Sequence, residues 1–403
     1  MAQVRVPPNS YSYSKLKYLH YGLGSISKLP ETVKNLGASR ALILTGKSVS
    51  KSPIFEETSK ALGPIHVTSF TDIGQHTPVA GIRATLAVLK EKDADIIIAL
   101  GGGSPIDAAK AISYYKNEST SQGFLKIIAI PTTLSAAEYT QNAGYTNEEG
   151  HNVPGFLACV RVLAYAFIGI NQRSTIGSRC RYFGWKYHYI YTDSTLAFEW
   201  YSGSGSCSRN IIPTMAFPII ESALASIPQL FENLLKPHAD PNELEARRRL
   251  LNAAYLSLSP NPKPGALGLS HSLGHKLGAT YQILHGITSC LTLAKSTALK
   301  ARFADPYSQK NLTRAVKRLK AEAENILPNV VTENEPEASK GGVILSKYIE
   351  DLVQKLGLSS TLAEWKVPKA DLEGIAKMME KGGLAGVEGQ PSVNHVHDLL
   401  DSI

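Results

Sequence analysis

The chain alternates short apolar runs with longer amphipathic stretches between residues 40 and 150. Four runs have the length and composition of β-strands: residues 40–45, 65–70, 95–100 and 125–130. The third run, DIIIAL, is apolar without alternation, as in a strand that is buried on both faces. An amphipathic helix is predicted over residues 79–90. Strands that alternate with helices at this spacing predict an α/β domain with a doubly wound, mainly parallel sheet.

The pattern changes after about residue 217, where apolar residues recur at helical spacing and no convincing strand appears. Helices are predicted over residues 230–235, 243–258, 268–284, 287–304, 312–326, 344–356, 369–379 and 396–400. We therefore expect an all-helical C-terminal domain, and 403 residues are enough for two domains. The predicted division gives residues 1–155 to the α/β domain and residues 156–403 to the helical domain.

Composition excludes several classes of protein. With 43% hydrophobic and 19% charged residues, the chain is too apolar for general disorder. No uninterrupted apolar run is long enough to span a bilayer, and the N-terminal segment lacks the apolar core of a secretory signal. Four cysteines are too few for a disulfide scaffold in this length. We therefore expect a cytoplasmic protein with no membrane partner.

The formal net charge is +8, and its position along the chain decides what it means. Residues 152–216 contain six basic and two acidic residues, so this segment carries half of the excess. The segment also holds three of the four cysteines and shows no clear period of 2 or 3.6 residues over most of its length. Because no nucleic-acid-binding motif accompanies the charge, we expect no nucleic-acid partner.

A glycine turn, Gly101-Gly102-Gly103-Ser104-Pro105, directly follows the third predicted strand and opens a helix. Glycines let the backbone turn sharply and approach a ligand closely, and the first turn of a helix offers unpaired N–H groups to a phosphate. The sequence matches neither GxGxxG nor the P-loop pattern. A tight turn that binds nothing is the alternative interpretation.

The next predicted strand ends in Pro131-Thr132-Thr133-Leu134-Ser135, which places three hydroxyl groups at its carboxyl end. Open α/β sheets bind ligands at the carboxyl ends of their parallel strands. Two such ends that face one crevice favour dinucleotide binding over an empty turn.

Three of the eleven histidines, His271, His275 and His285, fall within fifteen residues. His271 and His275 are four residues apart, so a helix places both on one face. His285 follows His271 by 14 residues, close to four helical turns, and could return to the same cavity. Surface clustering by chance and buried core histidines are the alternatives, but the spacing favours a ligand or catalytic cluster. His395 and His397 are two residues apart, and we interpret them as surface residues.

The motifs GGGSPIDAAKAIS, PTTLSAAEYT and HSLGHKLGATYQILHG occur in this order, and together they resemble the iron-containing alcohol dehydrogenase family. Within that family the chain is most similar to the maleylacetate reductase branch. The resemblance covers roughly residues 10–150 and 217–403. It implies the dehydroquinate synthase-like fold, with a nucleotide-binding α/β domain and a helical metal and substrate domain. It also implies a homodimer that transfers a hydride between NAD or NADP and a small-molecule alcohol, carbonyl compound or maleylacetate-like substrate.

The resemblance assigns roles to individual residues. It implies a cofactor site formed by Thr45, Gly101, Gly102, Gly103, Ser104, Thr132, Thr133 and Ser135. His271 and His285 match the two metal-ligand histidines of the family, and His275 matches the histidine that relays a proton. A divalent Fe or Zn ion polarises the substrate oxygen in such chemistry, and an imidazole exchanges protons near neutral pH.

The other two metal ligands of the family form an Asp-x-x-x-His pair, which should fall within residues 152–216 and is absent there. Two hypotheses account for this segment: a gene-level register error such as a retained intron, or a genuine divergent insertion. A site of two histidines would bind metal weakly unless Asp193, Glu199 or another group substitutes. The sequence therefore leaves open a catalytically impaired family member that keeps nucleotide binding.

Overall fold

The computed structural model describes residues 16–22, 24–75, 77–140, 142–148, 152–156, 167–168, 217–240, 243–258, 268–332 and 335–403. The described residues divide into two compact units. The first contains the described residues up to 168 together with residues 243–255, and the second contains residues 217–240 and the described residues from 256 onward. The predicted division after residue 155 stays a prediction.

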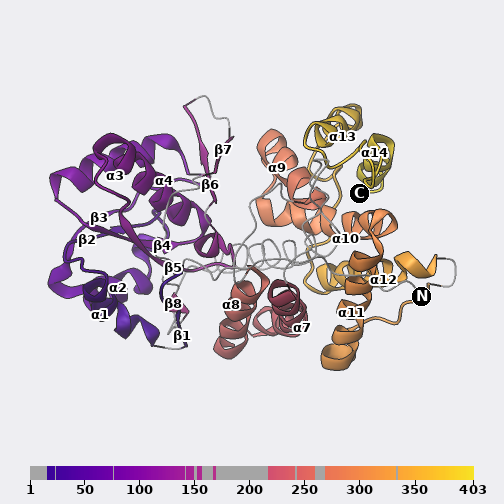
Figure 1. The fold of residues 1–403 in the computed structure, drawn as a ribbon, viewed down its shortest axis with the longest axis horizontal. Helices are drawn as coiled ribbons and strands as arrows, with labels where there is room; N and C mark the ends of the chain where they lie inside the picture. The colour runs from indigo at the N-terminus through magenta and orange to yellow at the C-terminus, as the bar shows by residue number, and fades with distance from the viewer. Residues whose placement is uncertain are drawn as a thin grey trace. The chain divides into compact units, whose positions relative to one another are not determined.

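The first unit is built on a parallel sheet of four strands in the order β3-β2-β4-β5 (Figure 1). The strands are β2 (Ala41–Leu44), β3 (His66–Phe70), β4 (Ile96–Gly101) and β5 (Lys126–Pro131). Every pairing within this sheet is parallel. The predicted doubly wound α/β domain is therefore confirmed.

Helices cover both faces of the sheet, because alternate residues of each buried strand point to opposite sides (Figure 1). On one face, Leu42 and Ile97 pack with α3 (Val79–Glu91) and α4 (Gly103–Thr120). On the other face, the next residues along the strands pack with two further helices, α1 (Leu29–Asn35) and α2 (Pro53–Leu62). The result is a three-layer arrangement with two hydrophobic cores.

Smaller elements complete this unit. A short 3₁₀ helix, η4 (Ala137–Tyr139), follows β5 and leads into an antiparallel hairpin of β6 (Asn142–Thr146) and β7 (Asn152–Phe156). The strands β1 (His20–Tyr21) and β8 (Phe167–Ile168) form a separate parallel pair. The sequence pattern did not predict the hairpin, because its strands have only five residues each and contain a glycine or a proline.

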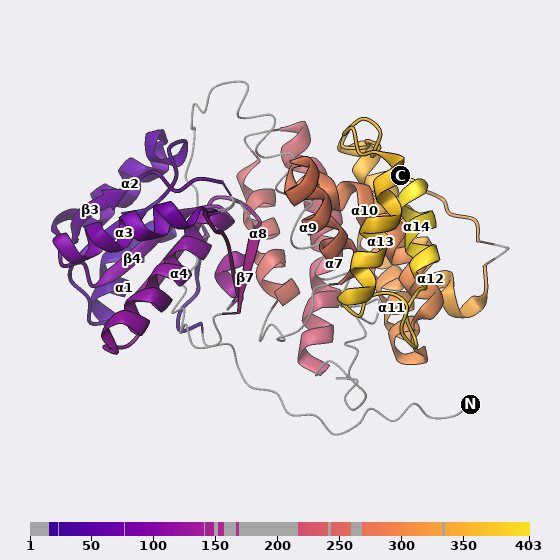
Figure 2. The same ribbon diagram turned by 90° about the horizontal axis from the view of Figure 1, so that it is seen from above.

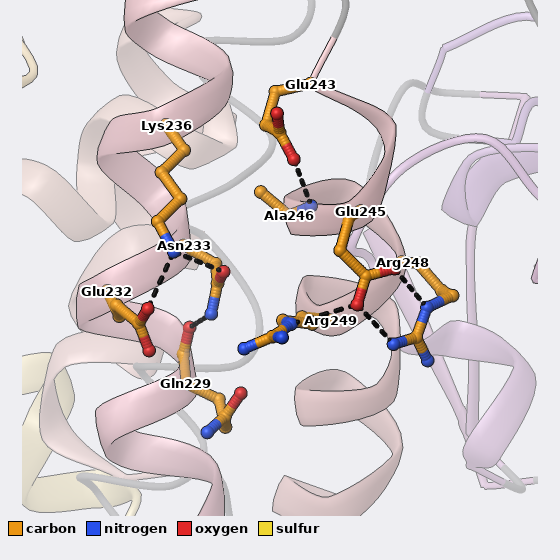
Figure 3. A network of polar contacts seen from close by, with 9 residues as sticks. All are labelled: Gln229, Glu232, Asn233, Lys236, Glu243, Glu245, Ala246, Arg248 and Arg249. Carbon is orange, nitrogen blue, oxygen red and sulfur yellow. Dashed lines mark hydrogen bonds and ion pairs between the residues drawn. The ribbon is translucent and has the colours of Figure 1, made fainter. Parts of the chain in front are cut away.

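Most of α8 (Leu244–Leu258) also groups with the first unit, where the ring of Tyr255 packs edge-on against Tyr139 at 5.3 Å. On this helix Glu245 accepts hydrogen bonds from Arg248 at 2.5 and 2.7 Å and from Arg249 at 3.0 Å (Figure 3). These bonds lower the pKa of Glu245 to about 2. Pairs at this spacing support the helix but are exposed, so their contribution to stability is small.

Among its described residues, the regular secondary structure of the second unit consists of helices (Figure 2). Its helices are α7 (Phe217–Ala239), α9 (Leu269–Tyr281), α10 (His285–Phe303), α11 (Pro306–Ala323), α12 (Glu337–Lys355), α13 (Leu372–Lys381) and α14 (Val393–Asp401). The helix α10 packs against α9, α12 and α14, and α11 joins α12 to α7. The predicted helical domain is confirmed in this part of the chain. None of the described helices has the length and apolar character needed to cross a membrane.

Candidate functional site

The carboxyl ends of three adjacent strands meet at one edge of the parallel sheet. Thr45 directly follows β2, Gly101 ends β4 and Pro131 ends β5. The strands β4 and β5 stay in register to their last residues, and beyond them the Thr132 N–H donates to the Gly101 carbonyl at 2.9 Å. The predicted edge therefore exists, and it brings the glycine turn beside the threonines that follow β5.

The glycine turn fits closely against the segment that follows β5. A Cβ atom on Gly102 would lie 3.1 Å from Thr133 Oγ1, and one on Gly103 would lie 3.4 Å from the Cβ atom of Ser135. Gly101 has a φ of +145°, a conformation that favours glycine. Side chains at these positions would fill the space next to Thr133 and Ser135. Glycine leaves this space open, so a ligand can approach the backbone of the turn.

The helix α4 begins at Gly103 and points its first N–H groups out of this turn. Its N-cap residue is Gly102, which has no side chain to cap those groups, and its first turn contains no acidic residue. Behind the turn, the hydroxyl of the buried Thr77 donates to the Ser104 carbonyl at 3.1 Å. Helix starts with these features can bind anions, including the pyrophosphate of a dinucleotide.

Two buried hydroxyl groups at this edge have no hydrogen-bond partner among the described residues: Thr45 Oγ1 and Thr133 Oγ1. An unsatisfied buried hydroxyl costs about 1–3 kcal/mol, so it is rarely retained without a reason. A ligand that follows the carboxyl ends of β2 and β5 would supply partners for both groups. Three features of the predicted cofactor residues thus suit a dinucleotide: the glycine backbone, the uncapped helix N-terminus and the two unpartnered hydroxyl groups.

The sequence reasoning overlooked two buried charged residues in this region, Lys110 on α4 and Glu138 on η4. Burial raises the pKa of the Glu138 carboxyl to about 7, and the nearby Asp107 carboxylate adds to this rise, while the positive charge of Lys110 opposes it. A lysine or glutamate within a helical pattern is ordinarily exposed, so only their packing reveals them.

The candidate histidines lie in the second unit. His271 and His275 stand one turn apart on α9, and their Nε2 atoms lie 2.8 Å apart, so one ring donates its N–H to the other. The rings pack edge to face with centroids 4.5 Å apart. Burial, together with the nearby His275, lowers the pKa of His271 well below its ordinary value, so His271 is neutral at pH 7. The prediction that one helix face carries both rings agrees with this geometry.

His285 is the first residue of α10, and its side chain lies outside the described part of the structure. Its predicted role therefore stays a prediction, and Asp193 and Glu199 also lie outside the described residues.

His395, interpreted as a surface residue, is exposed, but its Nδ1 atom accepts a hydrogen bond from the N–H of Ser392 and its ring packs on Phe303. It caps the start of α14.

The described residues do not fit a complete metal site. They contain no group of three or more His, Cys, Asp or Glu side chains placed to hold an ion. Two nitrogens bound to one tetrahedral Zn²⁺ lie roughly 3.3 Å apart, given Zn–N bonds of about 2.05 Å. The 2.8 Å separation of the His271 and His275 Nε2 atoms is that of a hydrogen bond.

Comparison with protein families matches most of the chain. Residues 17–164 match the family described as iron-containing alcohol dehydrogenase, and residues 211–403 match the C-terminal part of the Fe-containing alcohol dehydrogenase family. The interval between these two matches lies within residues 152–216, the segment that lacks the Asp-x-x-x-His pair.

Individual relatives agree with this family. The chain is 28% identical over 373 residues to a maleylacetate reductase of Sphingobium indicum, which covers 91% of this chain and 89% of that protein. It is 22% identical over 399 residues to an NAD-dependent methanol dehydrogenase of Bacillus methanolicus, at 95% and 96% coverage. The crystal structure of a 1,3-propanediol oxidoreductase has the same fold, with a TM-score of 0.77, 20% identity and coverage of 98% and 100%.

Proposed function

Because the chain belongs to the iron-containing alcohol dehydrogenase family, we propose that it transfers a hydride between NAD(P)H and a small carbonyl compound or alcohol. A maleylacetate-like oxo acid is the preferred substrate class within this proposal. Its support is the PTTLSAAE motif and the similarity to a maleylacetate reductase.

The observation that carries the proposal is the pair of unpartnered buried hydroxyls beside an uncapped helix start. We assign the pyrophosphate to the backbone of the glycine turn, the adenosine end to Thr45 and the wall of the site to the residues after β5. The cofactor site then consists of Thr45, Gly101, Gly102, Gly103, Ser104, Thr132, Thr133 and Ser135. A bound nicotinamide supplies or accepts the hydride, while these residues bind and orient it.

We assign the proton exchange to the imidazole of His275, at the ring nitrogen that does not bond His271. Its Nε2 atom shares a hydrogen bond with the neutral His271 ring, which orients the His275 ring. Reduction of a carbonyl group requires one hydride and one proton, so a positioned imidazole complements the cofactor. His271 and His285 remain the proposed metal-ligand histidines, and no proton or hydride step in this proposal depends on an ion.

A second candidate is a family member that binds the nucleotide but turns over poorly. The absence of an Asp-x-x-x-His pair from residues 152–216 favours it. NADH and NADPH oxidation should be followed with maleylacetate and with simple aldehydes, with and without added Fe²⁺ or Zn²⁺. Turnover with any of these supports the oxidoreductase, whereas cofactor binding without turnover under every condition supports the impaired protein.

Nucleotide binding can be tested through the free hydroxyls. We expect Thr133→Val to weaken NADH or NADPH binding about tenfold, which equals about 1.4 kcal/mol, while leaving thermal stability unchanged or slightly raised. The control is Thr85→Val on α3, because the buried Thr85 hydroxyl already donates to the Gly81 carbonyl at 2.7 Å. That variant should lose stability but keep its cofactor affinity. Equal affinity for wild type and Thr133→Val would contradict the assignment.

A further inference from the structure

Lys110 is completely buried on α4, two turns after the glycine turn. A buried lysine requires partners for its charge and for its three N–H groups. Its Nζ atom donates to the Ala137 carbonyl at 2.7 Å, to Asp107 Oδ1 at 3.1 Å and to Thr140 Oγ1 at 3.3 Å. One partner is thus an anion, and the shortest bond goes to the backbone of η4.

One face of α4 contacts the segment that follows β5 at several points. Gly103, Asp107 and Lys110 are spaced by four and three residues, so they lie along the same side of the helix. Gly103 lies against Ser135, Asp107 Oδ2 accepts from the N–H of Gly144 at 3.1 Å, and Lys110 binds Ala137. The wall of the nucleotide site is therefore attached to the same helix whose N-terminus faces the pyrophosphate.

The segment held in this way contains two costly features on either side of Ala137. Ala136 has a φ of +50°, which is uncommon for a residue with a Cβ atom. Glu138 is a carboxyl group buried beside the Lys110–Asp107 pair. Strained backbone and buried charge persist only where the surrounding structure fixes them. The bond from Lys110 reaches the peptide that separates the two.

We propose that Lys110 is a positioning residue of the cofactor site: by holding the Ala137 carbonyl, it fixes Thr133 and Ser135 against the glycine turn. Asp107 in turn holds the ammonium group in place. This inference rests on the proposed nucleotide-binding function of the turn. Lys110 does not contact the cofactor; it acts through the segment that does.

The test compares two lysines that each donate to a backbone carbonyl. Lys126, at the opposite end of β5, donates to the Gly37 carbonyl at 3.0 Å in an exposed position. Kd values for NADH and NADPH are measured by fluorescence titration for wild type, Lys110→Met and Lys126→Met. We expect Lys110→Met to weaken binding about tenfold or more, and Lys126→Met to stay within about twofold of wild type.

A merely structural role for Lys110 is distinguished by the double variant Lys110→Met/Glu138→Gln. Loss of the ammonium leaves two acidic groups without their cation, so Lys110→Met also lowers the unfolding temperature. The second substitution removes one of those acids, and we expect it to restore stability without restoring cofactor affinity. Recovery of affinity together with stability would overturn the positioning role.

Asp107→Asn provides a milder variant in case Lys110→Met does not fold. It keeps an oxygen for the Gly144 N–H but removes the charge that holds Lys110, so cofactor affinity should fall about threefold. Wild-type affinity in both Asp107→Asn and Lys110→Met overturns the inference and leaves the proposed function intact. A wild-type protein that binds neither NADH nor NADPH overturns the proposed function, and this inference with it.

Discussion

The Nε2 atom of His275 lies 2.8 Å from the Nε2 atom of His271, on the next turn of the same helix. A hydrogen bond between two imidazoles couples their tautomers, because one ring must donate while the other accepts. The ring nitrogen of His275 that does not bond His271 is left to exchange a proton with a substrate. This geometry is the basis for assigning proton exchange to His275.

Replacement of His275 by alanine is expected to lower kcat by about 10²–10⁴-fold while leaving the Kd for the cofactor within about twofold, because a positioned acid–base group contributes to the chemical step. The measurement is steady-state NAD(P)H oxidation combined with cofactor titration. His397→Ala, at a partly exposed side chain of α14, is the control and should retain the activity of the wild type. Undiminished kcat in His275→Ala would show that another group moves the proton.

Metal content provides a separate prediction. The described residues assemble no group of three or more ligating side chains, and a pair of imidazoles binds Zn²⁺ or Fe²⁺ weakly. After dialysis against a chelator and reconstitution with Zn²⁺ or Fe²⁺, elemental analysis is expected to find well below one metal ion per chain following desalting. A full, tightly held equivalent would mean that ligands come from outside the described residues, with Asp193 and Glu199 the first to replace.

The helices α10 and α12 approach each other closely at Gly342. A Cβ atom on Gly342 of α12 would overlap the Cβ atom of Ala301 on α10. Gly342→Ala is therefore expected to lower the free energy of unfolding by about 1–3 kcal/mol through overpacking. Gly374 on α13 has no neighbouring atom within 4 Å of such a Cβ, so Gly374→Ala should instead gain up to about 1 kcal/mol from helix propensity. Denaturant unfolding of both variants checks the opposite signs.

The sheet was predictable because its strands are continuous apolar segments. The predicted run 95–100 became β4 (Ile96–Gly101), and the glycine turn followed directly. The helices were found but often shortened. Pro228 and Pro237 lie inside α7, and two glycines lie in the first turns of α12. Both residue types disfavour helix, so the sequence predicted shorter helices than tertiary packing produces here.

The cofactor edge was predictable because Gly101 and Thr132 end neighbouring strands, and parallel strands bring their carboxyl ends together. Lys110 could not be predicted from the sequence. Its burial depends on η4 packing against α4, a contact between residues 27 positions apart, and the local pattern alone favours an exposed lysine. The unpartnered state of the Thr45 and Thr133 hydroxyls is likewise a property of the folded chain.

The titration of the buried Glu138 carboxyl makes the free energy of unfolding depend on pH. Burial raises its pKa from the usual 4.5 to about 7, so between these values the unfolded chain has released the proton and the folded chain still binds it. The free energy of unfolding therefore falls as pH rises from about 4.5 to about 7, by an amount on the order of 3 kcal/mol, and this effect levels off above pH 7.

Glu138→Gln removes this titration, so the variant is expected to match or trail wild type near pH 4.5, to gain on it up to about pH 7 and to keep a nearly constant advantage above that. Thermal unfolding across this range, with the difference between variant and wild type plotted against pH, isolates the carboxyl from all other titrating groups. Glu118→Gln, at the exposed end of α4, is the control and should keep the wild-type slope. A difference curve for Glu138→Gln that is flat from pH 4.5 to 8 would mean that Glu138 ionises in the folded chain as it does in the unfolded one.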